Sequence, residues 1–118
     1  MDNKQRALWA GLKEAKLSWD GGIIEGFNVN GEFIDLPDYP NDIAACVRDF
    51  LPKLRETGYD EIDFYYHETA VGCTIYGDDL KSLNGVGNLW SEAFTNAVDK
   101  IIEYQRRRQD YRGGENDS

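Results

Sequence analysis

The sequence predicts an α+β domain, and three observations lead to this fold class. Apolar residues recur with helical spacing in three segments, near the N-terminus, after residue 41 and after residue 89. Between them lie two segments rich in β-branched and aromatic residues, each divided by a short turn. The length of 118 residues suits a single domain. We therefore expect an antiparallel sheet of three or four strands with three helices packed on it, an α-β-α sandwich-like arrangement in the order α-β(β)-α-β-β-α.

An apolar stripe predicts the first helix, over residues 3–17. Its members are Leu8, Leu12, Ala15 and Trp19. Their spacing of i, i+4, i+7 and i+11 places them on one side of a helix, and Gly21-Gly22 would end it. The strand segment that follows is divided at Asn30-Gly31. This dipeptide suits a two-residue type I′ turn, because both central positions of that turn need a positive φ.

The second helix is predicted to start at Asn41 or Asp42, either of which can cap it, and to stop at Gly58. Its expected core stripe is Ile43, Val47, Phe50 and Leu54. Residues 61–68 and 70–77 then form an antiparallel hairpin. A polar, glycine-rich loop leads to the last helix, over residues 89–108. The expected buried side of that helix is Trp90, Ala93, Phe94, Ala97, Ile101 and Tyr104. The domain thus covers residues 1–108, and residues 109–118 form a flexible tail.

Charge is the unusual feature of the composition, with 22 acidic and 13 basic residues and a net charge of −9. The excess is concentrated between residues 17 and 80, which hold fourteen acids and three bases. Direct nucleic-acid or anionic-membrane binding is not expected, because phosphate neutralisation needs clustered Lys or Arg, and no apolar run is long enough to span a membrane. A basic partner protein fits this charge, although acidity also serves solubility alone.

Ten acidic residues form the predicted partner-binding surface. They are Asp42, Asp49, Glu56, Asp60, Glu61, Asp78, Asp79, Glu92, Asp99 and Glu103. At 100° per residue, those at positions 42, 49 and 56 line up on the side of the second helix away from its apolar stripe. Those at 92, 99 and 103 form a similar row on the last helix. Both rows are expected to face solvent, either as a recognition surface or as an ordinary solvated face.

Strand alternation gives the second hairpin two faces. The apolar face is expected to hold Ile62, Phe64, Tyr66, Val71, Cys73 and Ile75. The other face carries the only His of the chain beside a carboxylate and two phenols, a set that could act as a general base or as a stacking platform. Backbone amides before the last helix could hold an anion. The candidate ligand site is therefore Asp63, Tyr65, His67, Tyr76, Gly85, Gly87 and Asn88. The same polar face could equally be a plain sheet face covered by a helix or by a second subunit.

The sequence suggests no catalytic residue, metal or cofactor. No Ser or Cys nucleophile is placed to form a triad with the His. Cys46 and Cys73 give neither a disulfide framework nor a zinc spacing, and both are expected in the core of a protein from a reducing compartment. We therefore do not expect an enzyme.

Four stretches carry a family resemblance: KLSWDGG, LPDYPNDIAACVRDF, YYHETAVGCTIYG and SEAFTNAVDKII. With these stretches in this order over residues 3–105, the chain resembles the phage ABA sandwich domain family. The resemblance implies a phage or prophage origin and α-β-α layering, and it supplies no catalytic motif.

The expected function is that of a small acidic phage accessory protein in the host cytoplasm. It would bind and inhibit a host protein with a basic surface, for example a nucleic-acid-binding defence component, through its acidic residues. The alternative is a small-ligand or nucleotide sponge that uses the Tyr65, His67 and Tyr76 face with the Gly85–Asn88 amides. A homodimer is also expected, with that aromatic face or Trp9 in the contact, since an uncovered aromatic patch on a monomer typically marks an interface.

Overall fold

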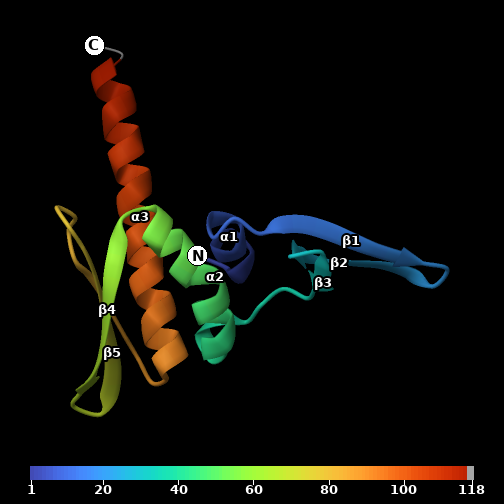
Figure 1. Cartoon of the computed structure of the whole chain (residues 1–118), viewed down its shortest axis with the longest axis horizontal. Helices are drawn as coiled ribbons and strands as arrows, with labels where there is room; N and C mark the ends of the chain where they lie inside the picture. The colour runs from blue at the N-terminus through green and yellow to red at the C-terminus, as the bar shows by residue number, and fades with distance from the viewer. Residues whose placement is uncertain (117–118) are drawn as a thin grey trace.

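The computed structural model describes the backbone of residues 1–116 and the side chains of residues 1–66 and 68–108. Within these residues the chain forms three α-helices and six strands (Figure 1). The elements in order are α1 (Asn3–Trp9), β1 (Lys13–Trp19), β2 (Gly22–Val29), β3 (Glu32–Ile34), the 3-10 turn η1 (Tyr39–Asn41), α2 (Ile43–Glu56), β4 (Tyr59–His67), β5 (Ala70–Gly77), β6 (Leu83–Gly87) and α3 (Trp90–Asn116). The predicted α+β class is confirmed, but the strands form two three-stranded sheets instead of the single sheet that was predicted.

Helix α1 is shorter than the sequence predicts. Asp2 caps it by accepting the amide of Gln5 at 2.8 Å, and the Gln5 side chain accepts the amide of Asp2 in return. The helix ends at Trp9 because Gly11 takes a φ of 94°, in the left-handed region that glycine tolerates. The prediction of a helix over residues 3–17 is therefore wrong in its second half, where strand β1 begins at Lys13.

The first sheet, sheet A, has the order β1-β2-β3 and is antiparallel throughout. It forms an arm of residues 13–34 that projects from the helices, on the right of Figure 1. The predicted turn between β2 and β3 is confirmed, because Asn30 and Gly31 have φ values of 52° and 86°. Phe27, near the base of the arm, is buried and belongs to the core of the molecule.

Helix α2 begins where it was predicted, since Asp42 caps it by accepting a backbone amide at 3.1 Å. The buried side of α2 is not the side that the apolar stripe predicted. Ile43 and Val47 were expected in the core and are nearly half exposed. The helix is rotated so that Cys46 and Asp49 are buried instead, beside the expected core residues of its second half.

The second sheet, sheet B, has the order β4-β5-β6. The predicted hairpin is confirmed as β4 and β5, with Phe64 opposite Cys73 on the face that was expected to be apolar. The segment Leu83–Gly87 was predicted as part of a loop and is strand β6, paired with β5. Gly85 of this strand lies against the backbone of α3, where an added Cβ would come within 2.3 Å of the Ala97 nitrogen.

The core lies between α2, α3 and one face of sheet B. Three aromatic rings cross it in sequence, with centroids 4.4 Å apart for Tyr39 and Phe50 and 5.6 Å apart for Phe50 and Phe94. Among the residues predicted for the buried side of α3, Ala93, Phe94, Ala97 and Ile101 are buried, whereas Trp90 and Tyr104 are partly exposed.

Helix α3 continues to Asn116, beyond the predicted end at residue 108. The flexibility predicted for residues 109–118 stays a prediction, and residues 117–118 lie outside the described residues.

Candidate functional site

Sheet B brings four of the predicted acidic residues together at one end. Tyr59 pairs with Gly77 and Glu61 pairs with Tyr76, so the start of β4 lies beside the turn that follows β5. The four residues are Asp60, Glu61, Asp78 and Asp79, and all are exposed. The sequence prediction could find them because acidic residues flank both strands of a recognisable hairpin.

The outer face of sheet B continues this acidic end along the strands. Asp63 and Tyr65 project from β4 on the same side as Glu61, and Tyr76 projects from β5 on that side. Helices α2 and α3 pack on the opposite face (Figure 1). We refer to the outer surface formed by Asp60, Glu61, Asp63, Tyr65, Tyr76, Asp78 and Asp79 as the acidic face. It combines part of the predicted partner surface with part of the predicted ligand site.

A hydrogen-bond network holds the middle of the acidic face. The Tyr65 hydroxyl donates to Oδ1 of Asn84 at 2.5 Å, and the Thr74 hydroxyl donates to the same oxygen at 2.8 Å. The Tyr65 ring crosses β5 above Gly72, where an added Cβ would come within 2.3 Å of the ring. One phenol of the acidic face is therefore fixed in place before any partner arrives.

The remaining members of the predicted ligand site are not brought to the acidic face. Gly85 and Gly87 turn toward α3, so they lie on the other side of sheet B from Tyr65. The amide of Asn88 donates to Oε1 of Glu92 at 3.0 Å. The carboxylate of this α3 residue therefore occupies the position predicted for an anion. The amide of Asn88 is thus already used within the chain, and a ligand site at Tyr65 with Gly85 and Gly87 stays a prediction. The side chain of His67 lies outside the described side chains.

Asp49 was predicted to face solvent, and this prediction is wrong because the residue is buried. Its carboxylate accepts the hydroxyl of Tyr39 at 2.9 Å and two nitrogens of Arg48 at 2.7 and 2.8 Å. Burial, with the bond to Asp49, raises the pKa of Tyr39 well above its ordinary value. Asp49 therefore anchors η1 to α2 and is not available to a partner. On the same helix Asp42 is an N-cap, and Glu56 remains exposed.

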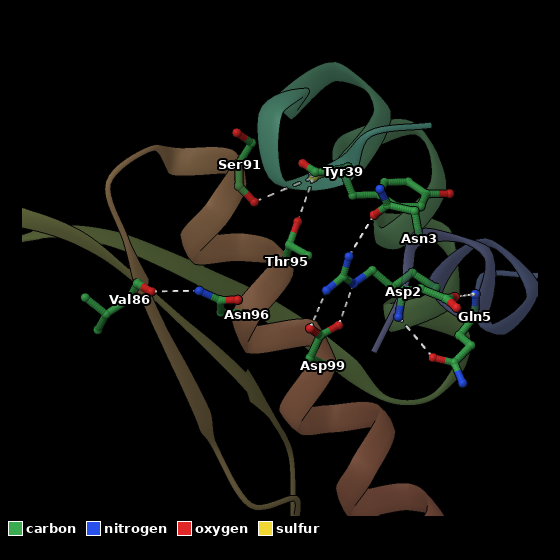
Figure 2. A network of polar contacts seen from close by, with 11 residues as sticks. Asp2, Asn3, Gln5, Tyr39, Val86, Ser91, Thr95, Asn96 and Asp99 are labelled. Atoms are coloured by element: carbon green, nitrogen blue, oxygen red, sulfur yellow. Dashed lines mark hydrogen bonds and ion pairs between the residues drawn. The ribbon is translucent and has the colours of Figure 1, made fainter. Parts of the chain in front are cut away.

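Asp99 was also predicted on a solvent-facing row and is instead a structural residue. Both of its carboxylate oxygens accept from the Arg6 guanidinium at 2.8 Å, and Arg6 is buried. Asn3 accepts a third guanidinium bond at 2.7 Å, and Asn3 and Asp99 face each other across this contact in Figure 2. The bond to Asp99 raises the pKa of Arg6 further. This cluster joins α1 to α3. Glu103, from the same predicted row, stays exposed.

The structure shows an aromatic ladder that the sequence analysis did not identify. Phe64 packs edge-on against Phe94 in the core at 5.9 Å and against Trp90 at 5.5 Å, and Tyr66 continues the series with its ring 5.5 Å from Trp90. Tyr66 is 83% exposed. Strand alternation had assigned Phe64 and Tyr66 to the covered face. Both contact α3 on that face, and they stay partly exposed on β4, which is an edge strand of sheet B.

An open cavity of about 620 Å³ lies where α1 meets the arm. Its walls include Lys4, Glu14, Lys16, Glu25, Phe27 and Leu36. Both lysines are paired, Lys4 with Glu14 at 3.0 Å and Lys16 with Glu25 at 3.8 Å. Nothing in the sequence indicates this cavity, because the apolar spacing around residues 14–16 predicts a helix there.

Both cysteines are buried, as predicted. Burial raises the pKa of Cys46 to about 11 and that of Cys73 to about 12. Cys46 also donates to the carbonyl oxygen of Tyr39 at 3.1 Å. Both thiols are therefore protonated and inert at neutral pH. Among the residues that the structure describes, no three His, Cys, Asp or Glu side chains are grouped so that they could hold a metal ion.

Comparison with known proteins adds no relative. No family model matches the chain, and neither a curated protein nor a solved structure matches it. The resemblance to the phage ABA sandwich domain family therefore stays a prediction. In the described part of the chain, no helix is long and apolar enough to cross a membrane.

Proposed function

We propose that this chain is a non-enzymatic protein-binding module, and that its acidic face binds a basic surface on a partner protein. The observation that carries the proposal is the acidic face itself, a sheet surface that joins carboxylates with two phenols and has no helix of the described chain packed on it. Complementary charge would steer the partner to this face, and the phenols supply the side-chain type that is enriched at the centres of protein interfaces.

The charge balance of sheet B supports this choice of surface. Residues 59–87 contain six Asp or Glu and a single Lys or Arg, Lys81. The Lys81 ammonium lies 6.0 Å from the centre of the Tyr104 ring, which belongs to α3, so this cation is directed toward the helix. The field in front of the acidic face is therefore negative and little compensated.

Charge reversal tests the proposal, provided that it avoids the structural carboxylates. A Glu61→Lys/Asp63→Lys variant reverses two charges on the acidic face. A Glu56→Lys/Glu103→Lys variant makes the same change in net charge at two exposed helix positions. Each variant and the unchanged protein serve as bait for proteins from a bacterial lysate, at low and at high salt, with circular dichroism to verify folding.

We expect the unchanged protein to retain a partner that the first variant loses and the second keeps, with retention falling as salt rises. Equal losses for the two variants would show that only the net charge matters and would reject the acidic face as the site. Failure to retain any partner would reject the function.

The narrower form of the proposal is a phage accessory protein that inhibits its host partner. It rests on the sequence resemblance and on the acidic face, which could occupy a nucleic-acid-binding surface of a defence component. The retained partner provides the test, because its nucleic-acid binding should decrease when the acidic protein is added.

Small-ligand binding is a second candidate, at a different place from the one the sequence predicted. The cavity beside α1 has a volume within the range of ligand sites, about 300–1,000 Å³, and combines Lys4 and Lys16 with the apolar ring of Phe27. An anionic ligand with an apolar part, such as a nucleotide, would have to displace Glu14 or Glu25. A thermal-shift screen tests this, since binding raises the melting temperature and Lys4→Ala should remove the shift.

A further inference from the structure

The arm has one apolar face that the described part of the chain leaves uncovered. Cross-strand pairing puts Leu17 opposite Ile24 and Ala15 opposite Gly26, and side chains two apart in a strand share a face. The apolar residues on this face are Ala15, Leu17, Trp19, Ile24 and Phe33, the last with its ring above Gly26, and Lys13 and Asn28 share the face at the base of the arm. Leu17, Trp19 and Ile24 are 50%, 53% and 40% exposed.

Toward the tip, the opposite face of the arm is mostly polar. It carries Glu14, Lys16 and Glu25, and the latter two lie directly opposite each other as an ion pair at 3.8 Å. Ile23, at 65% exposed, also lies on this side, and at the base Phe27 and Ile34 of the same face pack on the core. A sheet with one apolar face and one charged face is built to have its apolar side covered.

The arm has little to stabilise it alone. A two-stranded hairpin is marginal in water without a covering layer, and β3 adds only Glu32–Ile34 as a third strand. The buried side chain that ties the arm to the core is Phe27, near its base. Toward its tip the arm extends away from the described helices (Figure 1), and Trp19 at the end of β1 is largely exposed. A partner on the apolar face would supply the missing layer.

We propose that the apolar face of the arm packs against the same face of a second copy of this chain. Two flat sheet faces can interdigitate at a separation of about 10 Å, and a two-fold axis lets one surface meet itself. The contact would join Leu17, Trp19 and Ile24 of both copies in one apolar layer. This is a different interface from the one the sequence suggested.

The charge distribution favours contact through the arms over contact through other surfaces of two copies. Two molecules of net charge −9 repel each other. The arm carries only two lysines and four acids, and its apolar face bears no charge between Ala15 and Ile24. The acidic face lies on sheet B, at the other end of the molecule from the arm (Figure 1). Contact through the arms therefore brings two copies together with their acidic faces farthest apart.

The two surfaces that the sequence suggested for a dimer are less suitable. Trp9 donates its indole N–H to Gln105 at 3.0 Å and packs edge-on against Phe50. Tyr65 belongs to the acidic face, where two copies would repel each other. No described helix or strand packs on the apolar face of the arm, since the helices pack on sheet B and on each other.

The size of the face sets the expected strength. A seven-residue strand spans roughly 23 Å and three strands roughly 10 Å, from the usual rise and spacing. The face therefore covers roughly 230 Å², well below the about 800 Å² per partner of a standard interface. The dimer should therefore be weak and reversible.

Analytical ultracentrifugation across the micromolar range tests the proposal with two matched variants. Leu17→Lys places a charge in the apolar face, and Ile23→Lys places the same charge on the other face of the same arm. We expect a reversible dimer for the unchanged protein, a dissociation constant raised about tenfold or more by Leu17→Lys, and no comparable change for Ile23→Lys. Since Leu17 is already half exposed, the variant monomer should keep its helical circular dichroism.

Trp19→Arg provides a second variant on the apolar face, in case Leu17→Lys fails to fold. A strict monomer at every concentration would overturn the proposal, as would equal effects of Leu17→Lys and Ile23→Lys. A dimer that Tyr65→Asp dissociates and Leu17→Lys leaves intact would place the interface on the acidic face instead, and would also overturn it.

Discussion

At the scale of single residues, the environment of a carboxylate decides whether it serves binding or structure. Asp49 and Asp99 belong to the same sequence pattern as Glu56 and Glu103, yet each accepts two bonds from an arginine and is withdrawn from solvent. An acid loses its hydration when it is buried, and a two-pronged guanidinium replaces it. The partner of Asp99 stands 93 positions away in the chain, so local spacing could not reveal it.

The first prediction separates the two kinds of carboxylate. Asp99→Ala should lower the free energy of unfolding by about 3 kcal/mol, because it leaves the buried Arg6 charge without its partner. Glu103→Ala, one turn along the same helix, should change it by less than about 0.5 kcal/mol. Urea unfolding followed by circular dichroism measures both. Equal effects of the two substitutions would mean that the Arg6–Asp99 contact does not hold α1 against α3.

At the scale of elements, the sequence could predict what local rules determine. The cap at Asp42, the turn at Asn30-Gly31 and the β4–β5 hairpin depend on residues within a few positions of one another, and all three are present. The strand β1 was missed because Ala15 and Trp19 fit a helical stripe as well as a strand alternation. The segment forms a strand because it pairs with β2, which the spacing of its own residues could not show.

Strand β6 was missed for a different reason. Two of its three core-facing positions are Gly85 and Gly87, which carry no side chain, so Leu83 alone gives no alternating apolar signal. Glycine is needed there because α3 lies directly on the strand. The same helix also covers the strand from the side, since Asn96 donates to the carbonyl of Val86 at 2.8 Å, as Figure 2 shows, and Lys100 reaches that of Asn84. The close packing of α3 therefore requires glycines at the positions where apolar side chains would have indicated strand β6.

The second prediction tests this close approach. Gly85→Ala should destabilise the protein by about 3 kcal/mol, because the new methyl would meet backbone atoms of Ala93 and Ala97 at 2.4 and 2.3 Å. Gly72→Ala, on the other face of sheet B, meets only the ring of Tyr65 and should cost less. Thermal and urea unfolding compare them. If the two variants were equally stable, α3 could not lie as close to β6 as it does here.

At the scale of the whole molecule, the chain is thin, 21 Å along its shortest axis, and its surfaces are divided between two ends. The acidic face lies on sheet B, the apolar face lies on the arm, and the core between them is built from α2, α3 and sheet B. The composition could predict that the protein is acidic. It could not predict that the acidic and apolar faces lie at opposite ends, because this depends on sheet A projecting away from the helices.

The third prediction concerns the stability of the whole molecule in alkali. Cys46 and Cys73 have an ordinary pKa of 9.0 when exposed, and burial raises it to about 11 and about 12. Above pH 9 the unfolded chain loses these protons before the folded one, so stability is full below that pH and falls as pH rises toward 11. While only the unfolded thiol is ionised, each cysteine contributes a slope of about 1.4 kcal/mol per pH unit.

Urea midpoints from about pH 8 to about pH 11 measure this slope. The Cys46→Ala/Cys73→Ala variant should show a shallower fall, with a remainder from Tyr39, whose pKa is also raised. An unchanged slope in the double variant would assign the alkaline sensitivity to other groups.

The arm also has the geometry of an adjustable spacer. Its strands leave and rejoin the body side by side, since Glu14 pairs with Phe27 and Phe27 with Ile34. Deleting two facing pairs of residues, 15–16 together with 25–26, would shorten it by about 7 Å while keeping the inside–outside alternation of the tip. Deleting a single pair would invert the tip, because one residue per strand exchanges the two faces. The length of the arm can therefore change only by an even number of residues per strand if its apolar face is to stay on the same side.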